Sequence, residues 1–111
     1  MSDVLLDGFH AVKHALRFAP DLVSEVRTSD AAKMRRLAER LAPDLLDVLL
    51  ARAAAGPVQH HTGVQGLARR PEEDRSVLRA RTAPLVLLEA PRHPGNTGAV
   101  IRVAAAAAAS G

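Results

Sequence analysis

The chain contains no cysteine, which excludes a disulfide framework and a metal site built from thiolates. Its 111 residues include only two aromatic side chains, Phe9 and Phe18, so a surface on which single-stranded bases stack is not expected. The longest apolar run, residues 103–109, is much shorter than the roughly 20 apolar residues that span a bilayer. The amino terminus also lacks the basic and then apolar pattern of a secretory signal. These absences predict a cytoplasmic protein without a membrane segment.

Charged residues of both signs are common, but the excess of basic over acidic residues lies in the second half of the chain. The chain carries 15 basic and 12 acidic residues, with eight of each up to His60 and seven arginines against four acids after it. Only Lys13 and Lys33 are lysines, so the other 13 basic residues are arginines, which suit bidentate contact with phosphate. Nucleic acid is therefore one candidate partner. A coding bias toward arginine and alanine is the alternative explanation.

The first part of the chain shows hydrophobic periodicity that alternates between helical and strand-like spacing. Pro20 ends the first helical pattern, and residues 28–30 offer an N-cap for the second. On the second helix, Lys33, Arg36 and Arg40 are expected on the solvent side. The predicted order is helix, strand, helix, helix, then turn and strand: residues 9–18, 22–27, 31–42, 45–55 and 58–70. The fold class is therefore α/β.

The second part begins with a polar stretch, residues 70–81, that we interpret as a linker. The apolar run APLVLLEAP, residues 83–91, is bounded by prolines and is typical of a strand covered on both faces. A turn and an alanine-rich helix are expected after it. Such a strand either joins the sheet of the first domain or begins a second domain.

The turn after this strand has the composition of an anion-binding site. Glycines at 95 and 98 allow close approach of a ligand to the backbone, and Asn96 or Thr97 is expected to cap the following helix. Arg102 follows Gly98 by four residues, which places it near the same face as the turn. Asn96 and Arg102 are therefore expected to converge on one phosphate or ribose. An ordinary capped turn with a surface arginine is the simpler alternative.

The stretch PGNTGAVIRVA resembles the first signature motif, N-x-G-x-x-x-R-x-A, of the SpoU (TrmH-like) branch of the SPOUT RNA methyltransferases. Asn96, Gly98, Arg102 and Ala104 match that motif. LDGFHAVKHAL, at residues 6–16, is similar to the G-x-H-A-V-x-x-A-L opening of the family's substrate-binding domain. HHTGVQGLARRPEE resembles the last strand of that domain.

The resemblance implies three segments. Residues 1–70 are expected to form a small ribosomal-protein-like α/β sandwich that grips RNA, followed by a linker over 71–82. Residues 83–111 are expected to form the first strand and helix of a truncated trefoil-knot methyltransferase domain. Family members form homodimers mainly through the part that is absent here, so dimerisation of this chain alone is doubtful.

The implied reaction is 2′-O-methylation of a ribose in ribosomal or transfer RNA, with S-adenosylmethionine as cofactor. The resemblance assigns catalysis to Asn96 and Arg102. Because a guanidinium stays protonated and is a poor base, we expect Arg102 to hold phosphate and to stabilise developing alkoxide charge. The cofactor-binding residues are expected beyond Gly111, so the chain alone is expected to be inactive. The residues assigned to RNA binding are His10, Arg69, Arg70 and Gly98.

The sequence departs from the family pattern at His93, where aspartate or asparagine is usual, and at Ala107 and Ala108, where an aromatic residue and a glycine are common. No metal site is expected, because no acid or cysteine completes a ligand set with the chain's histidines. One rival interpretation is a stand-alone RNA-binding module in which the residues after Pro84 complete the sheet of the first domain. Another is an α/β fragment without a ligand.

Overall fold

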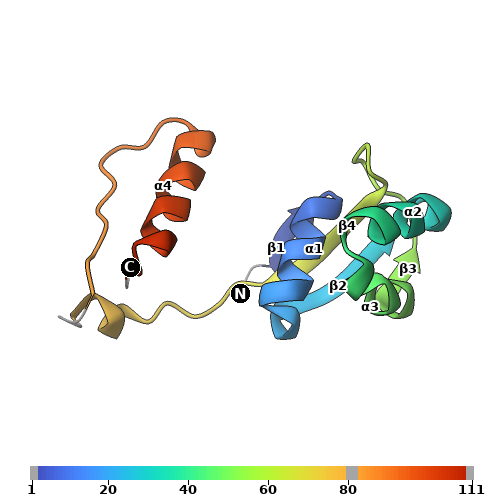
Figure 1. Cartoon of the computed structure of the whole chain (residues 1–111), viewed down its shortest axis with the longest axis horizontal. Helices are drawn as coiled ribbons and strands as arrows, with labels where there is room; N and C mark the ends of the chain where they lie inside the picture. Colours follow the sequence, from blue (N-terminus) through green and yellow to red (C-terminus); the bar gives the residue numbers. More distant parts are fainter. Residues whose placement is uncertain (1–2, 80–82, 110–111) are drawn as a thin grey trace. The chain divides into compact units, whose positions relative to one another are not determined.

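A mixed four-stranded sheet is the framework of the first part of the chain. The computed structural model describes residues 3–79 and 83–109, and its contacts divide the chain into a first unit, Met1–Pro71, and a second unit, Glu72–Gly111. The sheet has the strand order β1-β4-β2-β3 (Figure 1). Its strands are β1 (Asp3–Asp7), β2 (Val23–Thr28), β3 (Ala53–Ala55) and β4 (Val64–Arg69). β4 runs antiparallel to both β1 and β2, whereas β2 and β3 are parallel.

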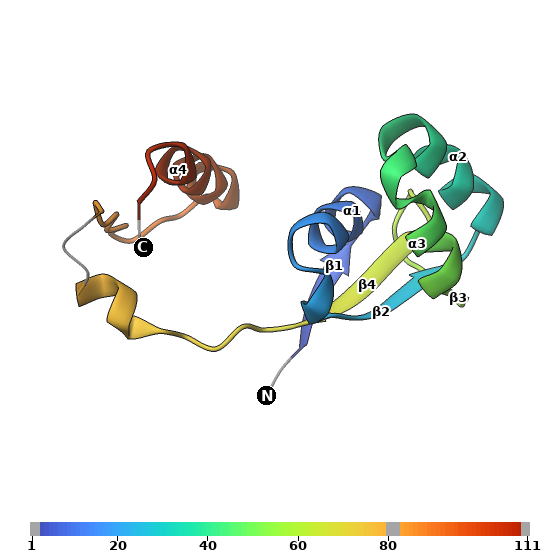
Figure 2. The same cartoon turned by 60° about the horizontal axis from the view of Figure 1, so that its bottom comes forward.

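Three helices cover one face of this sheet. They are α1 (Phe9–Phe18), α2 (Ala31–Leu41) and α3 (Leu46–Arg52). The crossover from β1 to β2 and the crossover from β2 to β3 move in the same direction across the sheet, so right-handed connections place all three helices on one side. Figures 1 and 2 show this arrangement. The sheet face turned away from the helices carries no other element among the described residues of this unit.

The hydrophobic core lies between the helices and the sheet. α1 contributes Phe9, Val12 and Leu16, whose i, i+3, i+7 spacing forms one stripe of the helix. The other large, fully buried side chains come from four further elements of the same unit: Met34 in α2, Leu49 in α3, Val26 in β2 and Val64 in β4. Because helical and strand residues belong to one buried cluster, the first unit has a core of its own.

Gly66 in β4 lies where neighbouring groups leave little room for a side chain. A Cβ at this position would lie 2.9 Å from the backbone oxygen of Glu25 and 3.3 Å from a methyl group of Val12. Both neighbours are held in place, one by the sheet ladder and the other by helix α1. The close approach of α1 to the sheet therefore requires glycine here.

We expect Gly66→Ala to lower the free energy of unfolding of the first unit by about 1–3 kcal/mol, the usual cost of overpacking. Urea denaturation followed by far-ultraviolet circular dichroism measures this change. The control is Gly95→Ala, because no heavy atom lies within 4 Å of a Cβ built at Gly95. Equal unfolding midpoints for Gly66→Ala and the unsubstituted protein would contradict the prediction.

The second unit contains a short 3-10 helix, Arg75–Arg79, and helix α4 (Pro94–Ala106). Asp74 precedes the 3-10 helix and accepts hydrogen bonds at Oδ1 from the hydroxyl of Ser76 (2.5 Å) and from its N–H (3.0 Å). Both bonds hold the pKa of the Asp74 carboxyl below its usual value, and the bond from the Ser76 hydroxyl has the larger effect. The predicted linker over 71–82 thus contains helical structure, and its residues 80–82 lie outside the described part.

The strand predicted over residues 83–91 is not formed among the described residues, and that prediction is wrong for this structure. A strand needs a neighbour that takes up its backbone hydrogen bonds. All four strands of the sheet come from residues 3–69, so residues 83–91 are not part of its ladder. The expectation that residues after Pro84 complete the first sheet is wrong for the same reason.

Two strands of the first unit were not predicted from the sequence. β1 was missed, and β3 had been assigned to a helix over residues 45–55 that instead ends at Arg52. Alanines 53–55 have high helix propensity, yet they pair with Val26–Thr28 in the parallel ladder. The guanidinium of Arg52 donates to the carbonyl oxygen of Val23 (2.6 Å) next to this pairing. Here tertiary pairing overrides local preference.

Candidate nucleic-acid interface

The motif residues Asn96, Gly98 and Arg102 all lie on helix α4. His93 is the N-cap of this helix, and its carbonyl oxygen accepts from the N–H groups of Asn96 (3.0 Å) and Thr97 (3.1 Å). Asn96 and Thr97 therefore lie in the first turn of the helix, and the prediction that one of them caps it is wrong. Pro94 explains the earlier start, because the fixed φ of proline suits the first helical position.

This early start decides which motif residues share a face. Gly98 and Arg102 are four positions apart, so they lie about one turn apart on the same face of the helix. Asn96 and Arg102 are six positions apart, which places them about 120° apart around the helix. Asn96 and Arg102 are both exposed, and no hydrogen bond joins them in the described ranges. No heavy atom lies within 4 Å of a Cβ built at Gly98, so the surface beside Arg102 is open.

Apolar side chains of α4 line two hollows in the second unit. Val100, Ile101 and Ala104 line a hollow of about 380 Å³ together with Val86 and Leu88. A second hollow, of about 430 Å³, is lined by further apolar residues of the same unit: Pro84, Ala99, Val103 and Ala107 among them. Neither wall contains a charged side chain or a side-chain hydrogen-bond donor, so neither hollow suits a charged ligand.

In the first unit, the loop over residues 56–63 is hydrogen-bonded to the start of α1. Thr62, which is only 8% exposed, accepts a hydrogen bond at Oγ1 from the N–H of Phe9 (3.1 Å). The N–H of Thr62 donates to Nδ1 of His60 (3.1 Å), and the His60 ring lies over Gly8. The side chain of Lys33 in α2 donates to the carbonyl oxygen of His61 in the same loop. This loop therefore connects the beginnings of α1 and α2.

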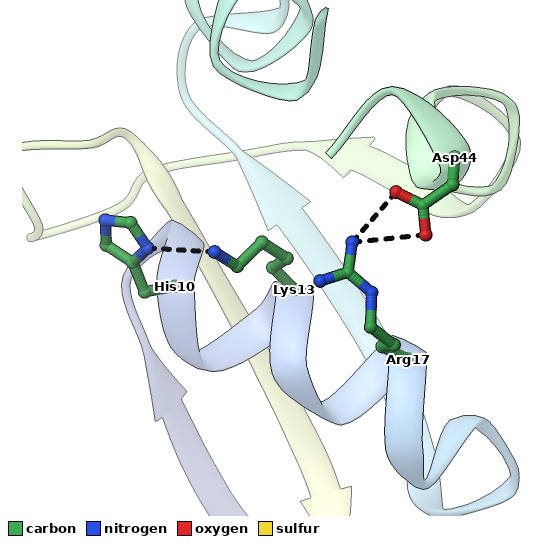
Figure 3. Close-up of polar contacts among 4 residues, drawn as sticks. All are labelled: His10, Lys13, Arg17 and Asp44. Carbon is green, nitrogen blue, oxygen red and sulfur yellow. Dashed lines mark hydrogen bonds and ion pairs between the residues drawn. The ribbon is translucent and has the colours of Figure 1, made fainter. Parts of the chain in front are cut away.

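His10, predicted to bind RNA, is exposed in the first turn of α1, with its Nδ1 3.3 Å from Nζ of Lys13 (Figure 3). Further along the helix, Arg17 makes two contacts from Nη2 to the carboxylate of Asp44, at 2.8 and 3.1 Å. The ion pair neutralises Arg17, whereas Lys13 places a positive charge beside His10. His10 can therefore face a polyanion from this end of the unit.

Arg69 and Arg70 lie at the opposite end of the sheet from His10. Arg69 stands opposite Asp3 at the start of β1, and its guanidinium donates to the carbonyl oxygen of Asp21 (2.8 Å). The five residues of β1 separate this end from the start of α1, a length of roughly 15 Å at 3.3–3.4 Å per residue. The structure does not bring these two predicted RNA-binding positions together.

A cationic stripe that the sequence analysis treated as ordinary solvent-facing charge runs along α2. Lys33, Arg36 and Arg40 surround Leu37 and line a hollow of about 270 Å³. The neighbouring Arg35 contacts Glu39 (3.3 Å), the only acid within α2, which leaves the stripe uniformly positive. The i, i+3, i+7 spacing was visible in the sequence. The sequence does not show that Glu39 contacts Arg35 and not a residue of the stripe.

The sheet face without helices has mixed charge. Arg27 pairs with Glu25 (2.5 Å), and Gln65 donates to Asp7 (3.0 Å). Leu5 and Leu67 lie opposite each other and line a small hollow of about 110 Å³ on this face. Because its charges are compensated, this face offers a polyanion less attraction than the α2 stripe does.

The described ranges, 3–79 and 83–109, contain no group of three or more histidine, cysteine or acidic side chains placed to bind a metal ion. No helix within these ranges is long and apolar enough to cross a membrane. In comparisons with protein-family models, curated proteins and solved structures, the chain matched none.

Proposed function

We propose that this chain belongs to an RNA 2′-O-ribose methyltransferase of the SpoU type, to which it contributes the RNA-binding domain and the first catalytic motif. The observation that carries the proposal is the placement of N-x-G-x-x-x-R-x-A at the start of α4. Gly98 and Arg102 share an open face there, and Asn96 lies exposed in the first turn. The partner proposed is ribosomal or transfer RNA.

The first unit supports the RNA-binding part of the proposal. It has its own core beneath three helices, Lys13 lies near the beginning of α1, and Lys33, Arg36 and Arg40 form a positive stripe along α2. A rigid α/β unit with such a surface can hold an RNA strand through its phosphates, since these contacts require cations and fixed geometry rather than base recognition. The ribosomal-protein-like sandwich and the knotted catalytic domain are the finer fold that we propose.

Arg102 is the residue proposed to act on the reacting ribose. Its guanidinium presents several N–H donors and keeps its charge at every physiological pH, so it can bind a phosphate and stabilise negative charge developing on the 2′-oxygen. Asn96 projects from a different side of α4 and is proposed to contact the ribose or a neighbouring phosphate independently of Arg102.

S-adenosylmethionine is the methyl donor that the proposal requires. Its charged amino-acid part and its ribose need hydrogen-bond partners, and the apolar side chains that line both hollows beside α4 do not provide them. The described residues therefore do not fit this cofactor. The use of S-adenosylmethionine is proposed from the sequence resemblance.

Removal of the Arg102 guanidinium tests the assignment. In the protein produced from its complete gene, we expect Arg102→Ala to lower kcat for methyl transfer to RNA by roughly 100- to 1,000-fold, the usual loss when a donor to developing negative charge is removed. Transfer of radioactive methyl groups from S-adenosylmethionine to RNA measures the rate. Arg92→Ala is the control, because Arg92 is exposed but lies before the helix. Unchanged turnover in Arg102→Ala would contradict the assignment.

One observation favours the alternative function, an RNA-binding module without catalysis. The sheet of the first unit and its core are built from residues 3–69, so RNA binding does not require α4. A protein from the complete gene that binds RNA but transfers no methyl group would favour this alternative.

A further inference from the structure

We propose that Arg36 and Arg40 of α2, together with the hollow over Leu37, form a contact surface for the phosphate backbone of base-paired RNA. This inference rests on the proposed function and identifies which face of the RNA-binding unit meets its partner. We name the surface formed by Arg36, Leu37 and Arg40 the α2 surface.

The first argument is the distribution of partners among the arginines of the first unit. The side chains of Arg36 and Arg40 make no hydrogen bond or ion pair with other residues of the described ranges. By contrast, the other five arginines in the helices and strands of this unit contact a carboxylate or a backbone oxygen: Arg17, Arg27, Arg35, Arg52 and Arg69. The two α2 arginines therefore have their donors available for an external anion.

The second argument is the electrostatic repulsion between Arg36 and Arg40 when no anion is bound. Arg36 and Arg40 are four residues apart on one face, and like charges at this spacing repel each other and destabilise a helix. Glu39 would relieve this repulsion if it turned toward Arg36, but it contacts Arg35 (3.3 Å). Phosphates placed between the two guanidinium groups would replace repulsion by two charge-assisted contacts.

The third argument is the shape of the surface. Arg36 and Arg40 are separated by about 6 Å along the helix axis, and Leu37 lies between them at the hollow of about 270 Å³. Lys33 closes one end of the hollow while its ammonium group is bound to the loop at His61. Side chains at fixed separation around a shallow depression suit a phosphate backbone, which is held at several points along its path.

Base-paired RNA is favoured over single strands because Phe18 is the only phenylalanine, tyrosine or tryptophan side chain that the unit exposes. Phe9 is fully buried, and the ring of Phe18, which is 76% exposed, lies stacked beside His14 on α1 with a centroid distance of 6.0 Å. Proteins that bind single strands combine a basic groove with several exposed aromatic rings. Double-stranded RNA is instead recognised largely through its phosphates and its shape.

The test is the salt dependence of binding to a fluorescein-labelled RNA hairpin, measured by fluorescence anisotropy with the 111-residue chain. Each phosphate contact contributes about 0.9 to the slope of log K against log salt for a duplex, so Arg36→Gln/Arg40→Gln should lower the slope by about 1.8. The affinity near 0.1 M salt should fall by roughly 10- to 60-fold. The unfolding midpoint should stay equal or rise, because the like-charge pair is removed.

The matched control is Arg17→Gln/Arg27→Gln, which removes two positive charges from positions that lie outside α2 and are already paired with Asp44 and Glu25. Its slope should change by less than about 0.5. An equal loss in this control would assign the effect to net charge and overturn the proposal. An unchanged slope in Arg36→Gln/Arg40→Gln would overturn the α2 surface while leaving RNA binding intact.

Three further outcomes distinguish a failure of the α2 surface from a failure of the proposed RNA-binding function. Absence of RNA binding by the unsubstituted chain would contradict the RNA-binding function itself. Polyuridylate that binds as tightly as the hairpin, with the same loss in Arg36→Gln/Arg40→Gln, would overturn the preference for base-paired RNA. Loss of binding to phosphatidylserine vesicles in this variant, with RNA binding unchanged, would assign the surface to lipid and also overturn the proposal.

Discussion

Phe9→Ala is expected to lower the free energy of unfolding of the first unit by about 3–5 kcal/mol, the usual cost of removing a buried aromatic ring. Phe9 is fully buried at the start of α1 and belongs to the core cluster that joins α1, α2 and α3 to the sheet. At about 0.05–0.15 kcal/mol per residue, a unit of this size has a total stability of roughly 4–10 kcal/mol. The substitution therefore removes a large fraction of that stability.

Urea denaturation monitored by far-ultraviolet circular dichroism measures the effect of Phe9→Ala. Phe18→Ala provides the matched control, because it makes the same chemical change at the other end of α1, where the ring is 76% exposed. We expect the control to change the stability by no more than about 0.5 kcal/mol. If both variants unfolded at the same urea concentration, Phe9 would not be the core residue described here.

Gly8→Ala is expected to lower the free energy of unfolding by about 2–4 kcal/mol, the sum of backbone strain and crowding. Gly8 has φ 99° and ψ 167°, a region that residues with a Cβ rarely adopt. An added Cβ would also lie 2.5 Å from Cε1 of His60. The substitution thus disturbs the backbone before α1 and the loop that is fastened to it.

A double variant separates the two causes. In His60→Ala, the ring that would contact the new Cβ is absent, so the additional cost of Gly8→Ala should fall to the backbone strain of about 1–3 kcal/mol. The same denaturation assay measures all four proteins of the cycle. An undiminished cost of Gly8→Ala in the His60→Ala background would show that crowding by the ring contributes nothing.

Much of the fold of the first unit could be predicted because several elements carry clear local signals. The predicted helix over 9–18 is confirmed as Phe9–Phe18, and the helix predicted over 31–42 ends one residue earlier at Leu41. Apolar residues at helical spacing mark both, and Asp30 caps the second by accepting from the N–H of Lys33 (3.0 Å). The strand predicted over 22–27 is shifted by one residue to Val23–Thr28.

The missed strands depend on residues far away in the sequence. β1 is short and mostly exposed, and its ladder forms with β4, where Asp3 stands opposite Arg69. β3 consists of three alanines that favour helix in isolation. Local periodicity carries no information about such distant partners, so neither strand could be recognised from its own residues.

The candidate site was predictable in composition but not in geometry. The sequence identified Asn96, Gly98 and Arg102, but the convergence of Asn96 with Arg102 was derived from a turn at 94–98 that is helical instead. The pairing of charges on α2 shows the same limit. Glu39 can reach Arg35 at i−4 or Arg36 at i−3, and only the folded side chains show that it contacts Arg35.

The central position of β4 bears on how the protein folds during synthesis. β4 is the last strand to leave the ribosome, yet it separates β1 from β2 in the sheet. Until Arg69 has emerged, β1 lacks the neighbour with which its ladder forms, and Phe9 lacks the hydroxyl of Thr62 that accepts its N–H. A nascent chain that ends before β4 has the residues of the helices and of the β2–β3 pair, but β1 joins the native sheet only in a late step, once β4 is available.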